Sequence, residues 1–221
     1  MQTAEKKYKA TSPSQVWKYN GIGGGSSVGA DIYGSFPITH NYPVKMAIID
    51  NQNPTTGNQP LPDQGDRDDQ RNGDEIYTKG IRLRIQLEND AGRHNNTYKM
   101  WMIEMNTSQG DCCVPTQLFH DVTGNNILNP IQTDRWSATY LGQYRTKARD
   151  VEANKKSDIF VNKWFPFKRK LKFVKDDTTS VAKGMKEQLW LVIVGYDSSN
   201  STGDLGLGNF RVSSTLYYSD P

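Results

Sequence analysis

Residues 72–89 read NGDEIYTKGIRLRIQLEN, and their alternation decides the fold class. After a turn at Asn72-Gly73, every second residue from Ile81 to Leu87 is aliphatic, and polar residues such as Arg82 and Arg84 stand between them. A period of two puts the aliphatic side chains on one face and the polar ones on the other. This pattern indicates a long, half-buried β-strand and excludes an amphipathic helix.

Seven further stretches have the composition of strands. Residues 98–105 and 189–196 are apolar at nearly every position, which is typical of central strands covered on both faces. Pro166 must interrupt a strand ladder, so the apolar and basic run around it divides into two strands. The eight predicted strands are Val44–Asp50, the strand from the turn at 72–73 to Asn89, Tyr98–Met105, Arg135–Arg149, Asp158–Trp164, Phe167–Val174, Leu189–Tyr196 and Asn209–Tyr218.

The connections between these strands suggest how they are arranged. Two long polar excursions, Asn51–Asp74 and Asn106–Asp134, interrupt the strands, and one or two turns of helix are expected within Thr116–Asp121. Eight antiparallel strands joined by a few long loops predict an all-β, eight-stranded antiparallel double-sheet jelly roll. We expect residues 1–41 to form an N-terminal arm and residues 42–221 to form the jelly-roll domain.

The composition excludes several classes of protein. No apolar run approaches the roughly 20 residues of a membrane helix, and no signal-peptide pattern opens the chain, so a soluble protein without a membrane partner is expected. The adjacent Cys112 and Cys113 have no partner spacing for a disulfide framework or a zinc site, so two buried thiols and no cofactor or metal are expected. His40, His94 and His120 are dispersed, which argues against a catalytic centre.

Charge is divided unequally along the chain, although the net charge is only +3. Residues 141–175 hold 11 Lys/Arg against 3 Asp/Glu, whereas residues 50–75 hold 2 against 7. Such separation on a rigid scaffold indicates a polyanionic partner for one surface. The acidic stretch reads as a solvated loop, with a calcium site as its alternative; its crowded carboxylates are Asp63, Asp66, Asp68 and Asp69.

Three fragments resemble one known family. They are GDEIYTKGIRLRIQL at 73–87, the order QLFH, DRW and YRTK between 117 and 147, and LWLVIVGYDSSN with NFRVSSTLYYSD near the end. Together they resemble the capsid proteins of small circular single-stranded DNA viruses, the geminivirus and circovirus-like group, over residues 72–219. The resemblance implies that residues 42–221 form a jelly-roll capsid domain that self-assembles into an icosahedral shell around single-stranded DNA.

The resemblance also implies a location in the virion, and in the host nucleus during assembly; it does not identify a host receptor. Members of the family usually begin with an arginine-rich arm that serves DNA binding and nuclear import. This chain begins MQTAEKKYKATSP. We therefore expect such an arm to be absent, removed or replaced by basic strand faces.

Two basic ladders are the candidate nucleic-acid-binding residues. Alternation places each set of three cations on one face of its strand, where lysines and arginines grip phosphates without reading bases. Solvated lysines and a nuclear-localisation run at 168–170 remain alternatives. Trp164 and Phe165 are expected to stack on bases if they are exposed. The six candidates are Arg145, Lys147, Arg149, Lys168, Lys170 and Lys172.

Two other functions suit a jelly roll. A lectin-like, carbohydrate-binding module would use Trp136, Trp164 or Trp190 as a sugar platform, but all three lie within predicted strands, where core packing is expected. A cupin-type oxygenase would need a cluster of histidines and carboxylates on a barrel strand. The three dispersed histidines do not provide one, so we expect no enzymatic activity.

Overall fold

The computed structural model describes residues 35–50, 74–90, 93, 95–121, 124–146, 157–173, 182–183, 188–198 and 206–219. Within these ranges the chain is built from strands, with one short α-helix, α1 (Pro115–Leu118), and a 3₁₀ turn, η2 (Thr107–Gln109). The strands are β1 (Phe36–Thr39), β2 (Pro43–Asp50), β3 (Glu75–Asn89), β4 (Asn96–Met105), β5 (Ser137–Arg145), β6 (Asp158–Phe165), β7 (Arg169–Phe173), β8 (Ala182–Lys183), β9 (Gln188–Asp197) and β10 (Gly206–Ser219).

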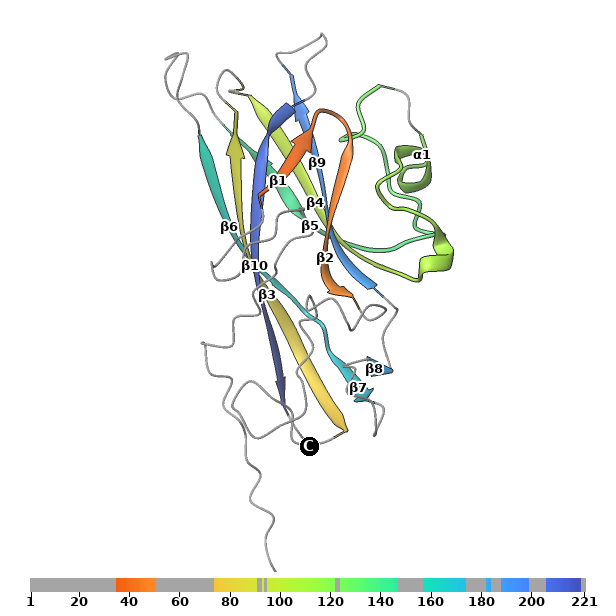
Figure 1. Ribbon diagram of the computed structural model, residues 1–221. Coiled ribbons are helices and arrows are strands. Elements are labelled where there is room, and N and C mark those ends of the chain that lie inside the picture. Colours follow the sequence, from red (N-terminus) through yellow and green to blue (C-terminus); the bar gives the residue numbers. More distant parts are fainter. Residues whose placement is uncertain are drawn as a thin grey trace, which may run out of the picture.

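The strands form two antiparallel sheets that pack face to face (Figure 1). The first sheet has the order β1-β10-β3, with β6 and β7 paired to successive halves of β3 and β8 beyond β7; the second has the order β2-β9-β4-β5. Counting β6 and β7 as one strand and omitting β8, the sheets read 1-8-3-6 and 2-7-4-5 in chain order. This is the strand order of a jelly roll, in which successive strands alternate between the sheets except for the fourth and fifth, and the predicted fold class is confirmed.

The sandwich has the predicted number of eight strand positions only because two differences from the prediction cancel. One strand was not predicted, and two predicted strands share one position. Residues 36–39, which the sequence analysis placed in the arm, form edge strand β1 against β10. Pro166 does split its run, but β6 and β7 occupy a single position beside β3. The segment FPIT is too short and too irregular to show a period of two, and its proline is tolerated at a sheet edge. Residues 1–34 of the predicted arm lie outside the described residues.

The stretch that decides the fold is also the strand around which the first sheet is organised. β3 pairs with β10 over most of its length, with β6 from residue 81 to 88 and with β7 from 75 to 78. Its aliphatic row is buried between the sheets, each side chain at most 1% exposed, as the alternation predicts: Ile81, Leu83, Ile85 and Leu87. These side chains belong to the main core of the sandwich.

A second, smaller core covers the outer face of the second sheet. The excursion between β4 and β5 folds back over β4 and β9, and Figure 1 shows it on the side of that sheet away from β3 and β10. Phe119, Ile127 and Trp136 pack there against Trp101 and Val192. β4 and β9 are therefore covered on both faces, which explains their apolar sequences. The predicted helical turn within 116–121 is found as α1, at residues 115–118.

A buried polar cluster joins the two sheets at the end of β3. It consists of Asn89, Asn96, Tyr98 and Thr146, each at most 3% exposed. The Tyr98 hydroxyl donates to Asn89 Oδ1 at 2.6 Å and accepts from Asn96 Nδ2 at 3.0 Å. Asn89 Nδ2 also donates to Thr146 Oγ1, at 2.8 Å. Burial raises the pKa of Tyr98, so its hydroxyl keeps the proton that it donates.

Candidate nucleic-acid interface

The lysines of β7 and of the residue before it point outward from the first sheet. Lys168, Lys170 and Lys172 are exposed. The aromatic and aliphatic residues that alternate with them are buried: Phe167, Leu171 and Phe173. The predicted alternation of this ladder is confirmed, and all three cations are accessible to solvent.

Glu75 is the acidic neighbour of this ladder. Its carboxylate lies 2.5 Å from Lys170 Nζ and 3.1 Å from Lys172 Nζ. Hydrogen bonds from both lysines lower the pKa of Glu75, and the bond to Glu75 raises the pKa of Lys170. The acidic stretch 50–75 and the basic stretch 141–175 are thus not separated in space here, because antiparallel pairing sets Glu75 directly opposite Lys172. Within the described residues, Lys168 is the member of the ladder that makes no ion pair.

Arg169, in the middle of the Lys168–Lys170 run, points the other way. Its guanidinium lies 2.6 Å from Glu104 Oε1 on β4, and the two side chains are 34% and 9% exposed. The pair links the two sheets at this end of the sandwich, because β7 and β4 belong to different sheets. The three consecutive cations therefore do not present one uniform basic surface.

The second predicted ladder is separated from the first. Arg145 is exposed at the end of β5, in the second sheet, whereas Lys147 and Arg149 lie outside the described residues. Arg145 adjoins Thr146, whose hydroxyl binds Asn89 at the last residue of β3. Lys172 pairs with Glu75, the first residue of β3. The two ends of β3 are about 45 Å apart, because the strand has 15 residues. The structure thus places the described members of the two ladders on different sheets and at opposite ends of β3.

The pairing of β10, β3 and β6 creates a different basic surface, which we call the arginine face. Three rows of outward residues cross these strands in register: Arg211–Gln86–Phe160, Ser213–Arg84–Asn162 and Thr215–Arg82–Trp164. The arginine face is defined by the cations and β6 side chains of these rows, namely Arg82, Arg84, Arg211, Phe160, Asn162 and Trp164.

Two cations of the arginine face have no counter-charge among the residues that the structure describes. Arg84 and Arg211 are exposed, and neither side chain makes a hydrogen bond or an ion pair within the described residues. Arg82 differs, because its Nε donates to Asn162 Oδ1 at 3.1 Å. Unneutralised guanidinium groups create a positive potential and offer planar, multi-donor recognition of phosphate.

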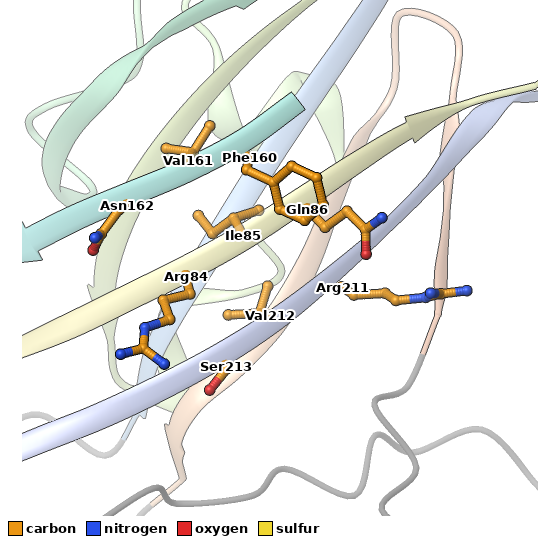
Figure 2. A pocket seen from close by; sticks show the side chains of 9 residues that line it. All are labelled: Arg84, Ile85, Gln86, Phe160, Val161, Asn162, Arg211, Val212 and Ser213. Atoms are coloured by element: carbon orange, nitrogen blue, oxygen red, sulfur yellow. The ribbon is translucent and has the colours of Figure 1, made fainter. Parts of the chain in front are cut away.

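Large aromatic side chains accompany these arginines. Phe160 is 76% exposed and Trp164 is 50% exposed. Phe160 borders an open cavity of about 430 Å³ that is also lined by Arg84 and Arg211. Figure 2 shows these three side chains coming from three neighbouring strands, β6, β3 and β10. Cations and exposed rings on one sheet surface are the combination that single-stranded nucleic acids require of a protein.

Gly80 makes room for Trp164. A Cβ atom at Gly80 would lie 2.2 Å from Cζ2 of the indole, well inside contact distance. The indole also meets the ring of Tyr217 edge-on, with the ring centroids 5.3 Å apart. Trp164 is therefore held flat against the sheet by its neighbours while half of its surface faces solvent.

Of the two aromatic residues expected to stack on bases, one has the exposure that stacking needs. Trp164 is exposed as base stacking would require, but Phe165 is 6% exposed and belongs to the core, because it is one position out of phase. Of the sugar-platform candidates, Trp136 is 1% exposed and donates its indole N–H to the Gln117 carbonyl. Trp190 is partly buried and lies beneath Lys45 Nζ.

Phe160, Arg84 and Arg211 were not among the candidate site residues that the sequence suggested. The outward phase of Arg82, Arg84 and Arg211 is visible in the alternation of their strands. The segment IFVNKWF is apolar in both phases, so its sequence does not say which of Phe160 and Val161 faces solvent. Asn162 offered a signal, because a polar residue indicates the solvent-facing side of a strand. Phe160 lies two positions away and therefore on the same side.

The described residues hold no cluster of three or more His, Cys, Asp or Glu side chains with metal-binding geometry. Cys112 is buried, as predicted, but Cys113 is only partly buried, and both thiols are free. His94 and the acidic residues 63–69 lie outside the described ranges. No helix among the described residues has the length and apolarity to cross a membrane.

Comparisons with known proteins give little further information. No family model and no curated protein matches the chain. Among solved structures, it matches a chain from the "Crystal structure of the T13 IBDV viral particle reveals a missing link in icosahedral viruses evolution", with 10% identity and a TM-score of 0.23. The match covers 84% of this chain and 35% of that chain, so this chain spans about a third of its length. A likeness at that TM-score carries no argument, and the fold assignment rests on the strand order.

Proposed function

We propose that this chain is a structural subunit of an icosahedral viral shell that encloses single-stranded DNA, and that it has no catalytic role. The observation that carries the proposal is the strand order 1-8-3-6 and 2-7-4-5, which is the jelly roll used by viral shells. The resemblance of residues 72–219 to capsid proteins of small circular single-stranded DNA viruses supports the same role.

The interior of the sandwich favours this role over that of a cupin-type enzyme. The space between the sheets is filled by aliphatic and aromatic side chains, including Met46, Phe167 and Phe210. A cupin-type site would instead place metal ligands in that space. A lectin-like role is less well supported, because Trp164 is the one strongly exposed member of its proposed platform.

The basic surfaces support a nucleic acid as cargo. The arginine face and the β7 lysines both belong to the first sheet, whereas the outer face of the second sheet is covered by its own excursion. The first sheet thus presents the cations and rings of these two surfaces to solvent, whereas the exposed ring and cation of the second sheet, Tyr140 and Arg145, lie on its edge strand β5. A shell subunit needs such a difference between the surface that meets its cargo and the surfaces that meet its neighbours.

Assembly is the first test. Purified protein should elute as a megadalton-scale species at neutral pH and moderate salt, and negative-stain microscopy should show closed particles of uniform size. A sharp peak at the 25.0 kDa of the single chain, persisting across salt and protein concentrations, would refute the proposal.

The cargo is tested separately. Changing Lys168, Lys170 and Lys172 together to Glu should leave particles but sharply reduce their nuclease-protected DNA. Two of these lysines bind Glu75, so the Glu variant also loses ion pairs. A variant with Gln at all three positions shows the effect of losing these pairs without reversing the charge, and a variant with Arg at all three positions keeps the positive charge. If the Glu variant packages as much DNA as the parent, these lysines do not contact the cargo.

A further inference from the structure

The cavity on the arginine face combines a ring with two cations. Phe160 is 76% exposed, and covering an aromatic side chain of that exposure is favourable for any ligand that can pack on its face. Arg84 and Arg211 line the same cavity (Figure 2) and have no counter-charge within the described residues. The remaining outward groups are amides and a hydroxyl, on Gln86, Asn162 and Ser213.

The register fixes the spacing of these groups. Phe160 and Arg84 are diagonal neighbours across β6 and β3, and Arg84 and Arg211 are diagonal neighbours across β3 and β10. Diagonal positions on adjacent strands are about 7–8 Å apart, within reach of long side chains. The Phe160 ring on β6 therefore has Arg84 on the adjacent strand, β3, and Arg211 on the strand after that, β10. The three strands span about 10 Å, which is twice the spacing between neighbouring strands.

We propose that Phe160, Arg84 and Arg211 form a binding site for an unpaired nucleotide of a single-stranded nucleic acid. Phe160 stacks on the base, and the two guanidinium groups bind phosphates of the same strand. This inference rests on the proposed function and deepens it, because it names how the shell distinguishes its cargo. In a duplex the base faces are stacked on one another, so Phe160 reaches none of them and only the phosphate contacts remain.

Charge favours this occupant over a second copy of the chain. Gln86 separates Phe160 from Arg211 in their row and donates its side-chain N–H to Asp158 at 3.0 Å. The next row carries Glu88 and Asp158, so the surface around the ring is polar and charged, with carboxylates in that row and the guanidinium groups of Arg84 and Arg211 across β3 and β10. Such a surface suits a strand with its phosphates at the arginines better than an apolar protein contact. A contact between copies is an outcome that the test distinguishes.

The test measures binding of three fluorescein-labelled probes to the full chain: an oligothymidylate, an abasic strand of the same length, and a duplex. Phe160→Leu keeps an apolar side chain but removes the ring face. It should weaken binding of the oligothymidylate by about fivefold to 150-fold, and leave the affinities for the abasic strand and the duplex unchanged. Phe160→Tyr should restore binding, and Leu128→Ala, at an equally exposed site in the excursion between β4 and β5, should have no effect.

The arginines are tested through salt dependence. Arg84→Gln and Arg211→Gln should each reduce the slope of log affinity against log salt by about 0.7, with both the oligothymidylate and the abasic strand. The site is refuted if the parent protein binds the abasic strand as tightly as the oligothymidylate. It is also refuted if Phe160→Leu impairs particle formation without changing oligonucleotide affinity, since the ring is then a contact between copies.

These outcomes are separable from failure of the proposed function. If no particles form under any condition, but oligothymidylate binding depends on Phe160, the shell proposal fails and the nucleotide site stands. If particles form and binding is independent of Phe160, the nucleotide site fails and the shell proposal stands.

Discussion

Replacing Tyr98 with Phe should destabilise the fold, because it removes one oxygen from the buried polar cluster between the sheets. The hydroxyl is the donor to Asn89 Oδ1, 2.6 Å away, and an acceptor for Asn96 Nδ2, 3.0 Å away. Without it, Asn89 Oδ1 is left buried with no donor among the described residues, which costs about 1–3 kcal/mol. Asn96 Nδ2 keeps its bond to the Leu207 carbonyl and loses about 1 kcal/mol.

The free energy of unfolding of Tyr98→Phe should therefore fall by about 2–4 kcal/mol, which lowers Tm by about 5–15 °C for a domain of this size. Urea unfolding followed by tryptophan fluorescence measures the loss, with parent and variant held in the same assembly state. Tyr144→Phe is the matched control, because that hydroxyl makes one long bond of 3.5 Å to the Leu141 carbonyl on a partly exposed residue. If Tyr98→Phe costs no more than Tyr144→Phe, the cluster does not hold the sheets together.

Three further changes follow from other buried or paired groups. Ser214→Ala should raise the free energy of unfolding by up to about 1 kcal/mol, because its hydroxyl is buried with no hydrogen-bond partner in the described part of the chain; a lower Tm contradicts this. Glu75→Gln frees two lysines, so the salt slope of single-stranded DNA binding should steepen by up to about 1.4, and an unchanged slope shows that those lysines do not touch DNA. Burial lowers the pKa of His40 below its ordinary 6.5, and its neutral Nδ1 accepts a hydrogen bond from the Asp197 backbone N–H. As the pH falls, His40 therefore binds a proton in the unfolded chain before it does so in the folded chain. Its contribution to stability is complete above pH 6.5 and is lost as the pH drops toward the lower folded pKa. His40→Gln should flatten the curve of urea midpoint against pH over that range.

The fold class was predictable because its signal is local. The alternation of β3 and the apolar composition of β4 and β9 each report burial directly, residue by residue. The strand order was not predictable in the same way, because it depends on which strands pair with each other across long loops. β1 was missed because four residues are too few to show a period, and Pro37 obscures the little there is.

The candidate site was less predictable than the fold. The outward phase of the β7 lysines was correct, because lysine in a strand reports exposure. The ion pairs of Lys170 and Lys172 with Glu75 follow from the pairing of β7 with β3, which joins residues far apart in the chain. The arginine face depends on the same kind of information, since no single strand holds Arg84, Arg211 and Phe160 together.

The placement of Trp164 over Gly80 has a practical consequence. Among the tryptophans that the structure describes, the other three are buried or partly buried, so Trp164 alone presents half of its surface to solvent beside the cavity. Its emission should be red-shifted and readily quenched by iodide or acrylamide, whereas the buried indole of Trp136 should be shielded. The molecule thus carries its own optical reporter of this sheet, and protection of Trp164 from a soluble quencher would register an arriving ligand without any added label.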